Sequence, residues 1–193
     1  VLLTDLSGGM VEAAVERATA AGYSAEGRVA GAERLPCPDA SAAHVIANHM
    51  LYHVPHPPDA VAEIARVLAD DGVAVVATNG ADHFRETKQL EHRVFGSRVV
   101  DRTVEAFGLE SGRPMLDAAF ASVELRRFAD TLRVTDPDDV MAYMCSYPPV
   151  EDGDASQIAA LRALVDEAFV AGDGVMTITK DVGLFLCRGP RRN

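Results

Sequence analysis

Short apolar runs and longer amphipathic stretches alternate along the first part of the chain. Apolar runs bounded by polar or glycine residues predict four strands, at 1–4, 28–30, 44–47 and 73–78. Apolar residues at helical spacing predict one helix capped by Ser7 and another that begins at Pro57 and extends to Gly72. The order strand, helix, strand, loop, strand, helix, strand is typical of an α/β domain with a parallel sheet and helices on both faces.

The second half of the chain has a different rhythm. It predicts, in order, two or three helices within 82–121, a strand at 122–128, a helix at 136–147 and a helix at 155–171. The C-terminal segment VMTITKDVGLFLCRG contains two apolar runs, separated by Lys180 and Asp181. Because no internal repeat or linker interrupts the pattern, the sequence predicts a single domain over 1–193.

Composition narrows the class of protein. The chain has 193 residues, 48% of them hydrophobic and 24% charged, which suffices for a sizeable core. The net charge of −11 argues against nucleic acid or an anionic membrane as a partner, since both attract basic surfaces. No apolar run reaches the roughly 18 residues of a membrane span. The scattered Cys37, Cys145 and Cys187 fit buried thiols in a reducing cytoplasm better than a disulfide framework.

The acid that ends the first apolar run is the most informative residue. In nucleotide-binding α/β domains, a strand-end acid binds the ribose hydroxyls about 20 residues beyond a glycine-rich turn. Asp5 lies too near the first residue for that turn to be present, and the first residue is Val. We therefore expect a fragment, or an incomplete chain, of a cofactor-binding enzyme.

Five parts of the sequence together resemble one family. They are LLTDLSGGM at 2–10, AGAERLPCPDAS at 30–41, HVIANHMLYHVPHP at 44–57, EIARVLADDGVAVVATNG at 63–80, and the pair SVELRRF at 122–128 with GLFLCRG at 183–189. In this order they resemble the second strand, adenine loop, fourth strand, fifth strand and late antiparallel pair of the class I S-adenosylmethionine-dependent methyltransferases, specifically the bacterial methyltransferase type 11 group.

The resemblance implies a Rossmann-like sheet, mostly parallel with an antiparallel edge strand. It implies methyl transfer from S-adenosyl-L-methionine to a small molecule, leaving S-adenosyl-L-homocysteine. By resemblance, the cofactor contacts are Asp5 at the ribose, Leu6 and Met10 flanking the adenine, Ala32 and Glu33 along its other edge, and Asn48 and His49 beneath the methionine portion. The segments 82–121 and 130–172 correspond to variable parts that cover the acceptor pocket. The resemblance identifies neither the acceptor nor its methylated atom, O or N, and it leaves a homodimer open.

The chain also departs from the family pattern. Gly31 stands where the family has an adenine-binding Asp, and Ala42 and Ala43 replace the usual Phe-Asp. The first central strand and its glycine loop have no counterpart in the sequence. These departures keep a second hypothesis open, a non-catalytic relative that serves as a binding or scaffolding subunit. A third, an NAD-dependent dehydrogenase, shares the ribose acid but does not predict the adenine loop or the late strand pair.

Histidines provide the candidates for proton transfer. His49, His53 and His56 have the spacing of metal ligands, but the intervening prolines prevent one helix from presenting all three, and no metal site is predicted. His53 fits either a structural role or that of a general base, and His83, beyond the fifth strand of the family pattern, is the better candidate base.

Two tyrosines add a candidate for the acceptor pocket. Tyr143 and Tyr147 lie four residues apart on a predicted helix, so they share a face. Their rings fit either the roof of a substrate pocket or core packing.

Overall fold

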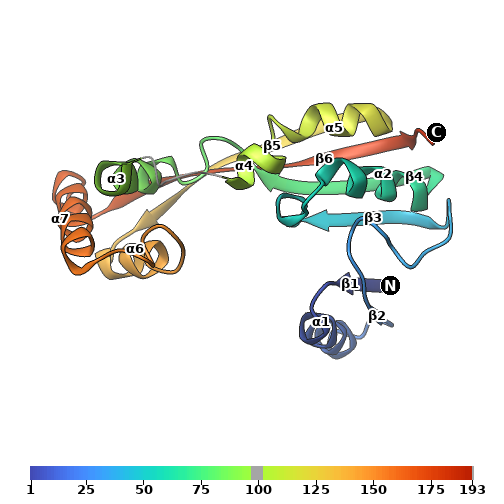
Figure 1. The fold of residues 1–193 in the computed structure, drawn as a ribbon, viewed down its shortest axis with the longest axis horizontal. Coiled ribbons are helices and arrows are strands. Elements are labelled where there is room, and N and C mark those ends of the chain that lie inside the picture. Colours follow the sequence, from blue (N-terminus) through green and yellow to red (C-terminus); the bar gives the residue numbers. More distant parts are fainter. Residues whose placement is uncertain (97–101, 193) are drawn as a thin grey trace.

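The computed structural model describes residues 1–96 and 102–192 (Figure 1). The strands are β1 (Leu2–Asp5), β2 (Glu26–Val29), β3 (Ala42–Asn48), β4 (Leu68–Asn79), β5 (Phe120–Val134) and β6 (Met176–Pro190). The helices are α1 (Gly8–Ala20), the 3₁₀ turn η1 (Leu51–His53), α2 (Pro57–Val67), α3 (Arg85–Phe95), α4 (Arg102–Phe107), α5 (Gly112–Ala119), α6 (Pro137–Met144) and α7 (Ala155–Ala171).

The strands form two sheets instead of the predicted single one. A four-stranded sheet has the order β3-β4-β6-β5, while β1 and β2 pair with each other in parallel. Only the β3–β4 pair is parallel in the larger sheet, because β6 runs antiparallel to both β4 and β5. The prediction of a mostly parallel sheet with an antiparallel edge strand is therefore wrong in two respects. The larger sheet is mixed, and its antiparallel strand lies inside the sheet, because the excursion through α6 and α7 returns the chain between β4 and β5.

The two helices predicted in the first half are present, but the second is shorter than predicted. Ser7 caps α1, and its Oγ accepts a hydrogen bond from the Met10 amide at 3.4 Å. Helix α2 ends at Val67, and the buried Leu68 is already extended, with ψ of 132°. The carbonyls of Arg66 and Val67 accept hydrogen bonds from the amides of Ala40 and Ser41, which satisfies the end of the helix. The chain can therefore enter β4 five residues earlier than the apolar spacing indicates.

Later elements agree more closely with the sequence pattern. The polar region 82–121 contains α3, α4 and α5, as predicted. Helix α7 spans the predicted residues, and Asp154 and Gln157 form a reciprocal capping box at its start. The late strand pair is confirmed, with Val123 opposite Cys187, but both strands extend well beyond the residues predicted for them.

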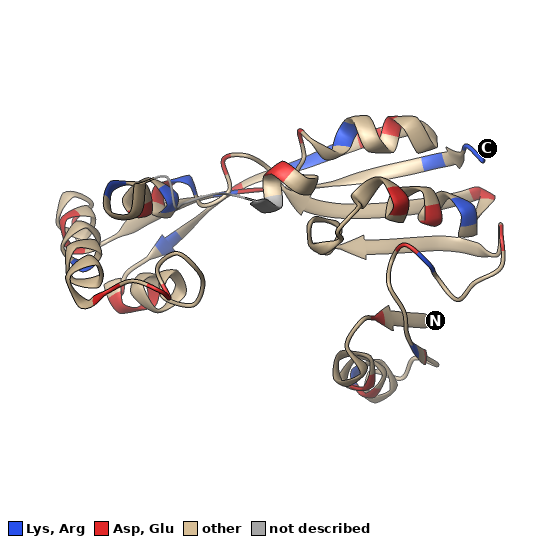
Figure 2. Ribbon diagram, in the orientation of Figure 1, with Lys and Arg blue, Asp and Glu red and all other residues tan. Residues whose placement is uncertain are grey.

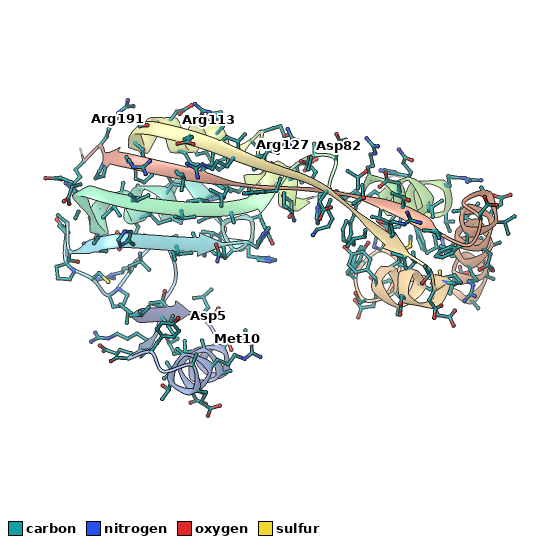
Figure 3. All side chains as sticks on the ribbon, turned by 180° about the vertical axis from the view of Figure 1, so that it is seen from behind. Asp5, Met10, Asp82, Arg113, Arg127 and Arg191 are labelled. Atoms are coloured by element: carbon teal, nitrogen blue, oxygen red, sulfur yellow. The ribbon has the colours of Figure 1, made fainter. Side chains whose placement is uncertain are left out.

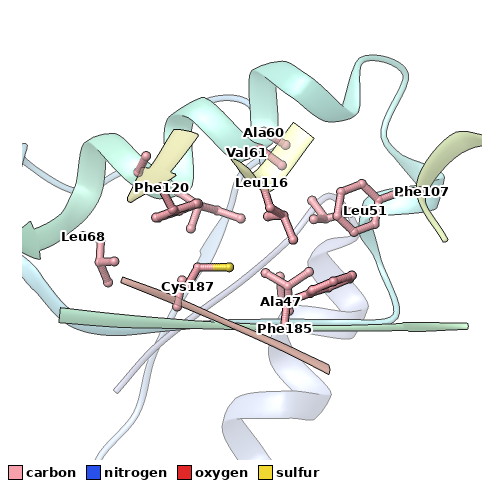
Figure 4. Packing of buried hydrophobic residues seen from close by; sticks show 14 of the residues in the cluster. Ala47, Leu51, Ala60, Val61, Leu68, Phe107, Leu116, Phe120, Phe185 and Cys187 are labelled. Atoms are coloured by element: carbon pink, nitrogen blue, oxygen red, sulfur yellow. The ribbon is translucent and has the colours of Figure 1, made fainter. Parts of the chain in front are cut away.

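The first hydrophobic core lies between the larger sheet and the helices α2 and α5 (Figure 4). Phe185 from β6 and Leu116 from α5 are fully buried there, together with Ala60 and Val61 from α2. Phe107 from α4 closes the same cluster. These contacts hold β3 and β4 so that their carboxyl ends lie at one edge of the sheet.

A second core lies at the far end of the long β5–β6 ribbon, which gives the molecule its extended outline (Figure 1). It is formed by α3, α6 and α7 packed on Met176 and Ile178 of β6. The segment 130–172 contributes α6 and α7 to this core. The segment 82–121 is divided, since α3 joins the second core and α5 joins the first.

The first core generates a stability prediction. Phe185→Ala should lower the free energy of unfolding by about 3–5 kcal/mol, because a fully buried ring leaves a cavity. Val170→Ala is the control, since Val170 is 80% exposed and should change stability by less than about 0.5 kcal/mol. Chemical denaturation measures both. Equal, small effects would contradict the assignment of Phe185 to the core.

Candidate functional site

The predicted cofactor residues lie where strands end at their carboxyl side, the edge at which open α/β sheets bind ligands. Asp5 is the last residue of β1, and Asn48 is the last residue of β3. Asp5 is exposed, and its Oδ1 accepts a hydrogen bond from the Ser7 amide at 2.8 Å. The carboxylate thus shapes the turn into α1 through one oxygen, and its second oxygen makes no hydrogen bond to the described residues.

Leu6 and Met10 carry unusually exposed apolar side chains beside Asp5. Leu6 is 76% exposed and Met10 is 60% exposed, so neither contributes to a core. Figure 3 shows Met10 beside Asp5. Leu6 extends toward the loop after β2, because its Cδ2 lies 3.5 Å from the point where a Cβ on Gly31 would be. Apolar side chains in this position suit the faces of a flat ring better than they suit water.

Glu33 approaches the same place from the other side. Its Oε2 lies 3.2 Å from the point where a Cβ on Gly31 would be, so the carboxylate occupies space left by the missing side chain. Leu6, Gly31 and Glu33 are therefore brought together, and Ala32 lies between two of them in the chain.

The end of β3 carries a strained backbone and a ring cluster. His49 has φ of +50°, a left-handed conformation that is uncommon outside glycine and often marks functional sites. Its amide donates to the Ala77 carbonyl at 2.9 Å, which fixes the turn. Tyr52 makes edge-to-face contacts with His49 at 6.5 Å and with His53 at 4.5 Å between ring centroids. Burial raises the pKa of the Tyr52 hydroxyl above its ordinary value.

His83 lies beyond the end of β4, and its ring is oriented by a backbone amide. The Asp181 N–H donates to His83 Nδ1 at 3.2 Å. Because a backbone amide can only donate, Nδ1 must be the accepting nitrogen, and the neutral ring carries its proton on Nε2. The ring also stacks on Phe84, with 4.3 Å between centroids. Phe84 has φ of +56°, which is strained for a bulky residue.

An ion pair between the partly exposed Arg127 and the buried Asp181 lies beside His83. Figure 3 shows Arg127 at the narrow junction between the two cores. The Asp181 side chain is only 6% exposed and accepts two hydrogen bonds from Arg127, from Nε at 2.6 Å and from Nη2 at 2.5 Å. The Asp82 amide donates to the same carboxylate at 3.2 Å. These hydrogen bonds, chiefly the one from Arg127, hold the pKa of Asp181 below its usual range. A depressed carboxyl pKa stabilises the fold above the unfolded pKa, and this stabilisation is lost as the pH falls through the folded value.

The charged residues within the apolar C-terminal segment indicated a special site, but not its partner. Lys180 and Asp181 interrupt the apolar C-terminal segment, but nothing in the pattern identifies Arg127 as the partner. Arg126, beside it, forms a surface pair with Glu124.

A ladder of aromatic rings connects this junction with α6 and α3. Phe84 contacts Tyr143 at 5.1 Å, and Tyr143 contacts Tyr147 at 5.3 Å between centroids. The predicted helix 136–147 ends at Met144, so Tyr147 lies beyond it and the prediction of a shared helix face is wrong, although the two rings are in contact. The Tyr147 hydroxyl donates to Oε1 of Glu91 at 2.5 Å, and burial together with this acceptor raises the pKa of Tyr147. Glu91 is 1% exposed and was not anticipated from the sequence.

No group of three or more His, Cys, Asp or Glu side chains within residues 1–96 and 102–192 is placed to hold a metal ion. No helix formed by these residues has the length and apolar character needed to cross a membrane.

Comparison with known proteins gives a family match over the first part of the chain and a likeness of fold over nearly all of it. Residues 1–76 match the protein family described as "Methyltransferase domain". No curated protein matches the chain. Among solved structures, a "putative methyltransferase" from Bacillus halodurans C-125 is 21% identical with a TM-score of 0.67, covering 99% of this chain and 83% of its own.

Two further solved structures extend the comparison. The YcgJ protein from Bacillus subtilis is 22% identical with a TM-score of 0.59, covering 100% of this chain and 82% of its own. The [4+2]-cyclase SpnF is 18% identical with a TM-score of 0.51, covering 97% of this chain and 65% of its own. At these identities the likeness concerns the fold.

The junction generates a second prediction. A Cβ on Gly80 would lie 2.1 Å from Oδ2 of Asp181, so Gly80→Ala should displace the carboxylate and lower stability by about 1–3 kcal/mol. In an Asp181→Ala background the same change should cost much less, because the clashing group is gone. A double-mutant cycle from thermal or chemical unfolding measures this coupling. Equal costs in both backgrounds would show that Gly80 is required for another reason.

Proposed function

We propose that the chain is a class I S-adenosylmethionine-dependent methyltransferase that transfers a methyl group to a small-molecule oxygen or nitrogen, in keeping with the match of residues 1–76 to a methyltransferase domain family. The observation that supports this proposal is a group of side chains that meet at the end of β1. There the exposed carboxylate of Asp5, the exposed side chains of Leu6 and Met10, and the loop with Ala32 and Glu33 lie close together.

The donor set fits the proposed cofactor. An exposed carboxylate suits two ribose hydroxyls, and the exposed Leu6 and Met10 suit the faces of an adenine ring. Glu33 offers an acceptor for an amino group from the space beside Gly31. Asn48 and His49 at the end of β3 would hold the amino-acid portion.

The protein's role in the chemistry is mainly positioning. S-adenosylmethionine supplies the methyl group as an electrophilic sulfonium, and transfer is an in-line displacement whose barrier falls when the partners are held in register. Asp5, Asn48 and His49 fix one partner. His83, whose Nδ1 is occupied by the Asp181 amide, would orient the acceptor by donating from Nε2.

The acceptor is proposed to be a small molecule bound between the strand ends and the second core, in a cytoplasmic setting. The net charge of −11 disfavours a polyanion. Figure 2 shows Lys and Arg interspersed with Asp and Glu over many elements. The ring ladder of Phe84, Tyr143 and Tyr147 and the helices α6 and α7 would cover the acceptor.

A second candidate function, a non-catalytic binding subunit, is favoured by the split sheet and by Gly31. Among the described residues no strand joins β1 to β3. The likeness to a [4+2]-cyclase is a reminder that the fold alone does not fix the reaction. An apolar strand followed by a glycine-rich turn, pairing between β1 and β3 in the full gene product, would favour the enzyme.

Cofactor binding has a direct test at Asp5. Asp5→Ala should weaken binding of S-adenosylhomocysteine by the full-length protein at least tenfold, about 1.4 kcal/mol, measured by calorimetry. Asp5→Asn is the matched variant, because its amide oxygen can still accept from the Ser7 amide while the charge is lost. It should also bind weakly. Glu12→Ala, on the exposed side of α1, should bind normally. No binding by the unaltered protein, or equal binding by all variants, would refute the proposed site.

Substitutions distinguish the roles of His83 and His53. His83→Ala should lower turnover roughly tenfold, the value of one hydrogen bond, and His83→Gln should restore much of it, because an amide nitrogen can replace the Nε2 donor. If His83 were a general base, turnover would instead fall about 10²–10⁴-fold in both variants.

His53 is exposed and its ring lies edge-on against Tyr52, so His53→Ala should leave turnover per folded molecule within twofold. Turnover is measured by S-adenosylhomocysteine release.

A further inference from the structure

The connecting loop, residues 30–41, determines how the two sheets are placed. It runs from the end of β2 to the start of β3 (Figure 1). Within the described residues no strand of one sheet pairs with a strand of the other. The position of Asp5 relative to Asn48 therefore depends strongly on how this loop is fixed.

Internal hydrogen bonds satisfy only part of the loop's backbone, among them the one from the Arg34 amide to the Gly31 carbonyl. Pro36 and Pro38 lack amide hydrogens, which removes two donors from a short segment. The Leu35 carbonyl accepts one hydrogen bond within the loop, from the Cys37 amide at 2.8 Å, and the carbonyls of Leu35 and Cys37 both accept from donors outside the loop. A guanidinium, with five N–H groups in a planar fork, is suited to supply them.

Arg66 on α2 supplies those donors. Its Nη2 donates to the Cys37 carbonyl at 2.9 Å and to the Leu35 carbonyl at 3.3 Å, and its Nη1 donates to the Asp39 carboxylate. Glu63, one helical turn earlier, accepts from Arg66 Nε and Nη2, each at 2.7 Å. The Leu35 amide donates to the same Glu63 carboxylate at 2.6 Å. The ion pair of Glu63 and Arg66 thus forms hydrogen bonds with both the amide and the carbonyl of Leu35.

The ion pair of Glu63 and Arg66 is held in place by the packing of α2 in the first core. Glu63 is only 11% exposed at its side chain, and the neighbouring Ile64 and Ala65 are buried in the first core. The hydrogen bonds from Arg66 hold the pKa of Glu63 below its ordinary value, so the carboxylate stays charged at neutral pH. The loop exit is anchored too, through the Ala40 amide on the Arg66 carbonyl.

We propose that Glu63 and Arg66 are positioning residues for cofactor binding, which lock the connecting loop so that Ala32 and Glu33 face Leu6. Glu33 lies two residues before Leu35, and its carboxylate already lies beside Gly31 and Leu6. Release of Leu35 would free this carboxylate and loosen the β1–α1–β2 unit that carries Asp5. The inference rests on the proposed function, because the ligand is S-adenosylmethionine or its product.

The test compares three arginine variants of the full-length protein. Arg66→Met keeps the apolar stem but removes every donor, and Arg66→Lys restores one point donor. Arg113→Met is the matched control, because Arg113 lies on α5 and its ion pair, with Asp117 at 2.8 Å, is on the surface and does not involve the loop. Two quantities are measured on samples that circular dichroism shows to be folded. They are the S-adenosylhomocysteine affinity by calorimetry and the hydrogen exchange rate of the Leu35 amide.

We expect Arg66→Met to weaken binding at least tenfold and to accelerate Leu35 exchange at least tenfold. Arg66→Lys should fall between Arg66→Met and the unaltered protein, and Arg113→Met should stay within twofold in both quantities. Faster exchange with unchanged affinity would overturn the positioning role, and unchanged exchange would overturn the lock itself. If the unaltered protein does not bind S-adenosylhomocysteine, the proposed function is wrong, and so is the part of this inference that concerns the cofactor. The exchange rates then still decide whether Arg66 holds the loop.

Discussion

The ion pair between Asp181 and Arg127 is the interaction on which the arrangement of the molecule depends. Asp181 lies on β6 between Ile178, which packs in the second core, and Phe185, which packs in the first. A carboxylate at such a point would be costly to bury alone, and its bidentate contact with Arg127 on β5 ties together the two strands that join the cores. The Asp181 backbone also accepts from the Gly80 amide and donates to His83, so the same residue fixes the end of β4.

A second constraint acts at the other end of the site. The β1–α1–β2 unit shares no strand pairing with the larger sheet within the described chain, and Glu63 and Arg66 hold the loop between them. The candidate site is therefore assembled from parts fixed by two separate ion pairs, one under the loop and one beside His83. Each pair combines a carboxylate that is nearly buried with an arginine that remains partly exposed. Neither core alone places Asp5, Asn48 and His83 relative to one another.

Local signals in the sequence predicted local structure well. The apolar face of α7 and the Ser7 cap of α1 were predictable because periodicity and capping depend on near neighbours. The pairing of 122–128 with 183–189 was predicted only through the resemblance to a family. Leu68 was assigned to a helix because it continues the apolar spacing, whereas tertiary hydrogen bonds from Ala40 and Ser41 end that helix at Val67. The split of the sheet and the position of β6 depend on long-range pairing, which spacing cannot reveal. The partners of Asp181 and Glu91 were missed for the same reason, since 54 and 56 residues separate them from Arg127 and Tyr147.

The central claim is that the ends of β1 and β3 form one cofactor site. A crystal of the full-length protein soaked with S-adenosylhomocysteine tests this claim most directly. The account predicts density for the ribose at the Asp5 carboxylate, for the adenine between Leu6 and the loop that carries Glu33, and for the amino-acid portion at Asn48. Well-ordered strand ends with no density at Asp5 at saturating ligand, or density bound elsewhere on the molecule, would contradict it.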